Sequence, residues 1–140
     1  MNNSKTRKRI LIVDDEPGIG KVLRINLRLS GYDVISTTSG AEAIELVRTR
    51  KLDIVLLDVL MPDVTGMDVL ERIRTFSQVP IIIFTVNPEI AREVLKMGAN
   101  DYIGKPLNLV LLADKIKLVL SPNQHIKGHD AKKEENPSRR

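Results

Sequence analysis

Five times along the chain, a short apolar run is followed by a stretch with the apolar spacing of a helix. Strands are predicted at 10–13, 32–37, 53–58, 79–84 and 101–103. Helices are predicted near 17–30, 40–47, 67–74, 88–95 and 109–119. Strands that alternate with helices through short connections favour a parallel sheet with helices on both faces. The sequence therefore predicts an α/β fold.

The third apolar run ends in an acid. Residues 54–57 are all apolar, which is typical of a strand buried on both faces, and Asp58 stands at its end. Water solvates a carboxylate far better than an apolar interior does, so we expect Asp58 in a cleft at the sheet edge. A lone acid at a strand end would most simply face solvent. The rest of the sequence argues otherwise.

Polar residues also follow the other predicted strands. Asp14 and Asp15 come after the first strand, Thr85 ends the fourth, and Lys105 follows the fifth. The carboxyl ends of parallel strands meet at one edge, so these side chains are expected together. Carboxylates brought together repel unless a cation joins them, and oxygen ligands suit Mg²⁺. A lysine and a hydroxyl suit phosphoryl oxygens, and a carboxylate can be the nucleophile that receives the phosphoryl group.

Composition excludes several classes of site. There is no cysteine among the 140 residues, so disulfides and thiolate metal sites are absent, and the two histidines lie in a polar tail. Residues 1–9 carry four basic side chains and no acid, whereas residues 10–120 carry a net charge of −2 within a total of +4. Without a membrane-length apolar run or a secretory signal, we expect a soluble, cytoplasmic protein that binds no membrane. We expect no nucleic-acid contact by this chain alone.

The joint pattern resembles the receiver domain of two-component response regulators over about residues 8–121. Each motif alone is weak, but together they are specific. The matching residues are 10–17 (ILIVDDEP), Asp58, Met61-Pro62-Asp63, Gly66-Met67, Thr85, 98–102 (GANDY) and Lys105-Pro106. The resemblance implies a flavodoxin-like (βα)5 fold, with a five-stranded parallel sheet of order 2-1-3-4-5. We expect a receiver domain over 9–121, after a basic extension over 1–8. From residue 122 the apolar periodicity is lost and polar residues dominate, so a flexible tail or linker remnant is expected over 122–140.

The resemblance also implies residue roles. Asp58 would accept a phosphoryl group from a phosphohistidine. Asp14, Asp15 and Asp58 would hold Mg²⁺, with the backbone carbonyl of Leu60 as a further ligand. Lys105 would pair with the phosphoryl oxygens, and the Lys105–Pro106 peptide bond is expected to be cis. Thr85 would bond another phosphoryl oxygen and couple to Tyr102, whose ring would move between exposed and inward positions.

The implied partner is a sensor histidine kinase or a histidine phosphotransfer protein. Phosphorylation would switch a surface formed by the last two helices and the fifth strand, through which a homodimer could form. The roughly 20 residues after 121 are too few for a further domain, so an output domain or partner protein is expected outside this chain. The sequence leaves open whether this is a stand-alone receiver or part of a DNA-binding regulator.

The chain departs from the family pattern in two places. Val86 stands where a small residue is usual, which could narrow access to Asp58, and the stretch from Thr85 to Gly98 is about two residues short. A phosphate-independent interaction module therefore remains an alternative. A Mg²⁺-dependent phosphatase is disfavoured, because its second acid would occupy the position of Leu60.

Several single residues also have ordinary interpretations. Asp63 and Asp68 are interpreted as a loop acid and a first-turn acid. Gly66 and Gly104 are interpreted as turn residues. Tyr102 is equally well interpreted as a core aromatic.

Leu60 and Asn87 lie two positions after Asp58 and Thr85, at positions that tune phosphate lifetime in this family. We predict that the apolar side chain of Leu60 slows attack of water on the phosphoryl group. Leu60→Asn should therefore lose phosphate faster than the wild type, measured on purified phosphorylated protein. An unchanged rate of loss would contradict the prediction.

Overall fold

The computed structural model describes residues 7–59 and 65–121. The chain divides into two compact units, residues 1–107 and residues 108–140. The described strands are β1 (Arg9–Val13), β2 (Asp33–Thr37), β3 (Ile54–Asp58), β4 (Ile81–Thr85) and β5 (Asp101–Gly104). The described helices of the first unit are α2 (Pro17–Leu29), α3 (Gly40–Thr49), α4 (Gly66–Arg74) and α5 (Pro88–Lys96). The second unit contains α6 (Leu109–Leu120), on which Leu112 and Ile116 are buried.

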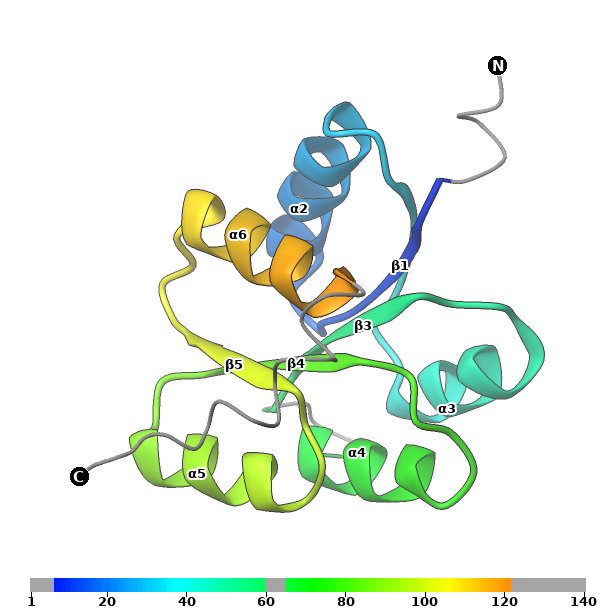
Figure 1. The fold of residues 1–140 in the computed structure, drawn as a ribbon, viewed down its shortest axis with the longest axis vertical. Helices are drawn as coiled ribbons and strands as arrows, with labels where there is room; N and C mark the ends of the chain where they lie inside the picture. The colour runs from blue at the N-terminus through cyan, green and yellow to red at the C-terminus, as the bar shows by residue number, and fades with distance from the viewer. Residues whose placement is uncertain (1–6, 60–64, 122–140) are drawn as a thin grey trace. The chain divides into compact units, whose positions relative to one another are not determined.

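The five strands form one parallel sheet in the order β2-β1-β3-β4-β5, which confirms the predicted α/β fold and strand order (Figure 1). Both β3 and β4 are buried along their whole length. Burial at every position explains why the sequences of these strands are continuous apolar runs rather than alternating ones.

The two faces of the sheet are covered by different helices. Figure 1 shows α3, α4 and α5 on the same side, where buried residues of all three join Leu11, Val55 and Ile83 in one core cluster. Helix α2 packs against β1 and β2 on the opposite face and buries Leu23 and Leu27. Since buried apolar area drives folding, this packing fixes the register of the strands and therefore the place where each one ends.

Side-chain caps begin three of the first unit's helices. Ser39 accepts a hydrogen bond from the backbone of Glu42, and Thr65 accepts one from the backbone of Asp68. Asn87 accepts from two backbone N–H groups at the start of α5, so this helix forms despite the short stretch between Thr85 and Gly98. Such caps stabilise a helix start by about 1 kcal/mol each.

The free edge of the sheet at β2 is covered by two arginines of α2. In a parallel edge strand, alternate residues direct their backbone groups away from the sheet. Arg28 Nη2 donates to the carbonyl of Val34 (2.9 Å), and Arg24 Nη1 donates to Ser36 Oγ (2.8 Å). This contact protects an edge that would otherwise be open to pairing with another chain.

Three strands begin later than the sequence predicted: β2 at Asp33, β3 at Ile54 and β4 at Ile81. Tyr32 belongs to the turn after α2, because its N–H donates to the carbonyl of Leu27 (3.2 Å). Val79 precedes β4, and its N–H donates to Ser77 Oγ (3.1 Å). Local turn hydrogen bonds hold these residues outside the ladder although their side chains favour a strand.

No helix within the described ranges combines the length and the apolar character needed to cross a membrane.

Candidate functional site

The carboxyl ends of β1, β3, β4 and β5 bring the predicted site residues to one edge of the sheet. Asp14 and Asp15 follow β1, Asp58 is the last residue of β3, and Thr85 is the last residue of β4. Lys105 follows β5 directly. Parallel pairing of these strands places all five side chains at the same end of the sheet, as the sequence led us to expect.

Three carboxylates gather at this edge. One oxygen from each of Asp14, Asp15 and Asp58 lies within 4.8 Å of the others. Asp14 and Asp58 are buried, and Asp15 is partly exposed. A set of carboxylate oxygens that is open to water on one side suits Mg²⁺, which usually keeps several water ligands.

Asp14 is the least satisfied of the three acids. Its Oδ1 accepts a hydrogen bond from the backbone of Glu16 (2.7 Å), but its buried Oδ2 has no hydrogen-bond partner in the described part of the chain. Burial raises the pKa of Asp14 from 3.8 to about 6, and the charge of Asp58 adds to the rise. The Glu16 N–H and the ammonium of Lys105 oppose it. Ionised Asp14 therefore lacks a positive partner that a cation would supply.

A cavity of about 460 Å³ opens beside Asp14. Lys21 and Arg24 of α2 line it, together with Thr37 and Thr38 at the end of β2. Of the three clustered acids, Asp14 lines this cavity.

Asp58 is held by a lysine. Lys105 Nζ donates to both carboxylate oxygens at 2.9 Å, while the Asp58 side chain is only 2% exposed. The Lys105–Pro106 peptide bond is cis, as the resemblance led us to expect. The sequence placed Asp58 in a cleft for the sake of hydration, but the structure buries it and stabilises its charge with the ammonium group of Lys105.

Thr85 and Tyr102 occupy neighbouring strands. Thr85 is buried, and its Oγ1 accepts a hydrogen bond from the backbone of Asn87 (3.1 Å). Tyr102 lies on β5 opposite Ile83 in the register, and 39% of it is exposed. Tyr102 is therefore not a plain core aromatic. Val86, directly after β4, is exposed.

Gly66 is a site residue whose importance the sequence analysis missed. A Cβ added to Gly66 would lie 2.2 Å from the carbonyl oxygen of Asp58 and 2.6 Å from the Cα of Val59. Gly66 thus allows α4 to begin directly against the end of β3, rather than serving a turn. The signal that could have found it is a glycine directly after a Thr65 helix cap. Gly104, also interpreted as a turn residue, lies in β5.

Some predicted residues remain untested or have ordinary roles. Leu60 and Asp63 lie outside the described residues. Asp68 is a first-turn acid of α4, as interpreted from the sequence. Asn87 caps α5.

The family model for the response regulator receiver domain matches residues 10–117. The chain belongs to the response regulator receiver family. Receiver domains generally act as phosphoacceptors in two-component systems, and this receiver carries the acidic cluster of Asp14, Asp15 and Asp58 at the expected edge of its sheet.

Similar curated proteins include the probable transcriptional regulator ycf27 of Guillardia theta, 39% identical over 118 residues. That match covers 83% of this chain and 46% of the relative. The DNA-binding response regulator MtrA of Mycolicibacterium smegmatis is 37% identical, over 84% of this chain and 53% of MtrA. The chain therefore spans about half the length of the curated relatives it matches.

Solved receiver structures share the fold. A CheY-like response regulator receiver domain protein from Methanospirillum hungatei is 31% identical with a TM-score of 0.79, covering 88% of this chain and 100% of that one. The response regulator TrrA from Thermotoga maritima, solved in complex with Mg²⁺ and BeF, is 33% identical with a TM-score of 0.74. That match covers 81% of this chain and 99% of TrrA.

Gly66→Ala should destabilise the receiver, because the added methyl group meets backbone atoms of Asp58 and Val59 that cannot move independently. We expect a loss of about 2 kcal/mol or more in the free energy of unfolding, measured by urea denaturation. Gly20→Ala in α2 is the matched control, since no atom lies within 4 Å of the added Cβ. An unchanged midpoint for Gly66→Ala would mean that α4 can move away from β3 at no cost.

Proposed function

We propose that Asp58 is the phosphoacceptor of this receiver and takes its phosphoryl group from a sensor histidine kinase or a histidine phosphotransfer protein. The observation that carries the proposal is the buried Asp58 carboxylate, which is held through both oxygens by Lys105 beside two further acids. A buried, oriented carboxylate next to a cation is suited to attack phosphorus, because the site favours charge on the incoming oxygens.

In the proposed reaction, a carboxylate oxygen of Asp58 bonds to phosphorus while the bond from phosphorus to the imidazole nitrogen breaks. The phosphoryl oxygens then take over the ammonium of Lys105 from the carboxylate. Asp14, Asp15 and Asp58, with the backbone carbonyl of Leu60, would hold Mg²⁺. When bound, the ion would supply positive charge that offsets the repulsion between the acids and the phosphoryl oxygens.

The proposed switch runs through Thr85 and Tyr102. The hydroxyl of Thr85 now accepts a hydrogen bond from the backbone of Asn87 and would turn to bond a phosphoryl oxygen. Its movement would allow the partly exposed ring of Tyr102 to change position. A homodimer through the last two helices and the fifth strand stays a prediction, as does a cytoplasmic location.

The same site residues discriminate between the phosphoacceptor and the alternative functions. A phosphate-independent module would not need Asp14, whose buried oxygen is unsatisfied in the described part of the chain. We therefore favour a phosphoacceptor over an inert module, and a signalling receiver over a turnover enzyme. The names of the ycf27 and MtrA relatives support a further proposal, that this receiver controls a transcriptional output.

Incubation with Mg²⁺ and acetyl phosphate tests the phosphoacceptor. We expect the intact mass of the protein to rise by one phosphoryl group, and we expect no rise for Asp58→Asn, which lacks the nucleophilic carboxylate. Asp68→Asn is the matched control, because it removes an exposed acid from the first turn of α4 and should leave the mass gain unchanged. No gain in the wild type, while another receiver is phosphorylated in the same buffer, would favour the phosphate-independent module.

Asp14→Asn tests the metal site through stability rather than activity. Without Mg²⁺ at pH 7.5, the variant should be more stable than the wild type by about 1 to 3 kcal/mol, because it removes a buried charge with an unsatisfied oxygen. Adding Mg²⁺ should raise the unfolding midpoint of the wild type and have little effect on Asp14→Asn. Equal responses of both proteins to Mg²⁺ would contradict the assignment of Asp14 as a ligand.

A further inference from the structure

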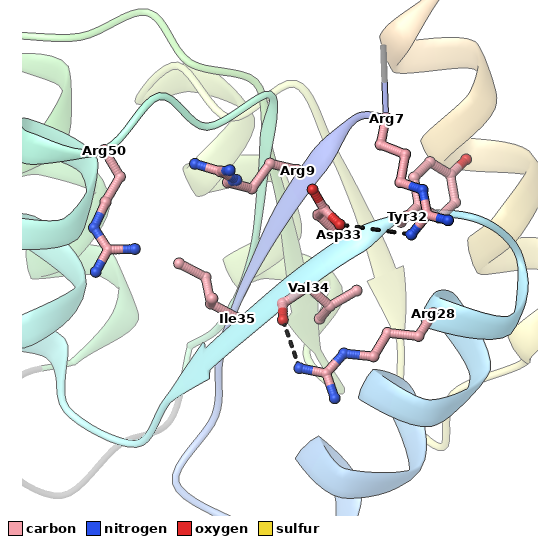
Figure 2. A pocket seen from close by; sticks show the side chains of 8 residues that line it. All are labelled: Arg7, Arg9, Arg28, Tyr32, Asp33, Val34, Ile35 and Arg50. Carbon is pink, nitrogen blue, oxygen red and sulfur yellow. Dashed lines mark hydrogen bonds and ion pairs between the residues drawn. The ribbon is translucent and has the colours of Figure 1, made fainter. Parts of the chain in front are cut away.

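A second concave site lies near the opposite end of the sheet. It has a volume of about 430 Å³ and is lined by the starts of β1 and β2 and by the C-terminal ends of α2 and α3 (Figure 2). Four arginines line it: Arg7, Arg9, Arg28 and Arg50. Among residues 7–59 and 65–121, Asp33 is its one acidic lining residue. The pocket is therefore strongly positive.

The intramolecular contacts leave part of this charge unused. Arg7 pairs with Asp33 at 3.8 Å, a long contact between half-exposed side chains, and Arg28 donates to the carbonyl of Val34. Within residues 7–59 and 65–121, the guanidinium groups of Arg9 and Arg50 have neither a hydrogen bond nor an ion pair. The nearby carboxylate of Asp53 accepts the backbone N–H of Arg9 (2.8 Å) and does not line the pocket.

Three further residues complete the lining of this partly open hollow. Tyr32, Val34 and Ile35 also line it, and Figure 2 shows the ring of Tyr32 beside Arg7. Burial raises the pKa of the Tyr32 hydroxyl. Ligand sites of small molecules typically enclose about 300 to 1,000 Å³, so the volume accommodates a small ligand. A groove for a nucleic-acid backbone would instead need to continue along the surface.

We propose that this arginine pocket binds a small anion that carries several phosphate groups. The guanidinium group presents parallel N–H donors that match a phosphate, and the free groups of Arg9 and Arg50 supply two such forks. More than one phosphate is needed because four positive charges line the pocket against the single carboxylate of Asp33. The same chemistry is offered by inorganic polyphosphate and by the phosphate chain of a nucleotide.

The pocket is separate from the phosphoacceptor site. Arg9 begins β1 and Asp14 follows its last residue, so a strand of about 15 Å lies between the two sites. Binding in the pocket should therefore persist in Asp58→Asn, and the two proposals can fail independently.

Calorimetric titration with inorganic triphosphate in Mg²⁺-free, low-salt buffer tests the proposal. We expect one-to-one binding to the whole chain, weakened about tenfold or more when Arg9→Gln and Arg50→Gln are combined. The matched control combines Arg92→Gln and Lys96→Gln, which remove the same charge from exposed positions of α5 and should leave the affinity unchanged. If the first pair fails to fold, Arg50→Gln alone, at an exposed helix end, should still weaken binding.

Further ligands distinguish the source of the phosphates. Adenosine triphosphate binding more tightly than triphosphate would identify a nucleotide as the ligand, and equal affinities would identify the phosphate chain alone. Absence of triphosphate binding, or equal weakening by both pairs of substitutions, would overturn the proposal. The proposal would also be overturned if a short DNA duplex bound more tightly than triphosphate and lost this binding when Arg9→Gln and Arg50→Gln were combined. The surface would then be a nucleic-acid contact.

Discussion

The contact between the Asp58 carboxylate and the Lys105 ammonium is the interaction on which the arrangement of the site depends. Asp58 closes a strand that is buried at every position, so its charge has almost no access to water. Removing a carboxylate from water costs several kcal/mol unless a cation and further hydrogen bonds replace the lost hydration. Lys105 contacts both oxygens and thereby ties the end of β5 to the end of β3, although β4 lies between them.

That ion pair compensates the charge of Asp58, one of the three clustered acids. Asp14 remains buried with one oxygen unsatisfied in the described ranges, and its raised pKa records the cost of ionising it there. Packing elsewhere in the fold offsets the free-energy cost of ionising Asp14. The buried apolar runs of β1, β3 and β4 fix where the strands end, and Gly66 lets α4 start against the backbone of Asp58. A local region of unfavourable electrostatics within a well-packed sheet is typical of a site prepared for a ligand charge.

Sequence reasoning predicted the parts of this structure that depend on local patterns. The apolar runs located the strands, and parallel pairing brought Asp14, Asp58 and Lys105 to one edge. The strand order came from the family resemblance. Features that depend on tertiary contacts were not predicted. Arg74, for example, donates to the carbonyls of Gly98 and Ser77 and to Asn100 Oδ1, and so ties the end of α4 to the turn before β5. The spacing of these residues in the sequence does not predict that contact. It does not predict the arginine pocket either, because four separate segments of the chain form it.

The parallel topology collects side chains from several strands at each end of the sheet. Every strand runs in the same direction, so residues that follow strands collect at one edge and residues that precede strands collect near the other. Asp14 and Asp15 follow β1, whereas Arg7 precedes β1 and Arg9 is its first residue. The parallel sheet thus brings Asp14 and Asp15 to one end and Arg7 and Arg9 to the other, although Lys105 also lies at the first end and Asp33 at the second. Repulsion within each group favours a ligand of opposite charge: a cation beside Asp14, and an anion beside Arg9.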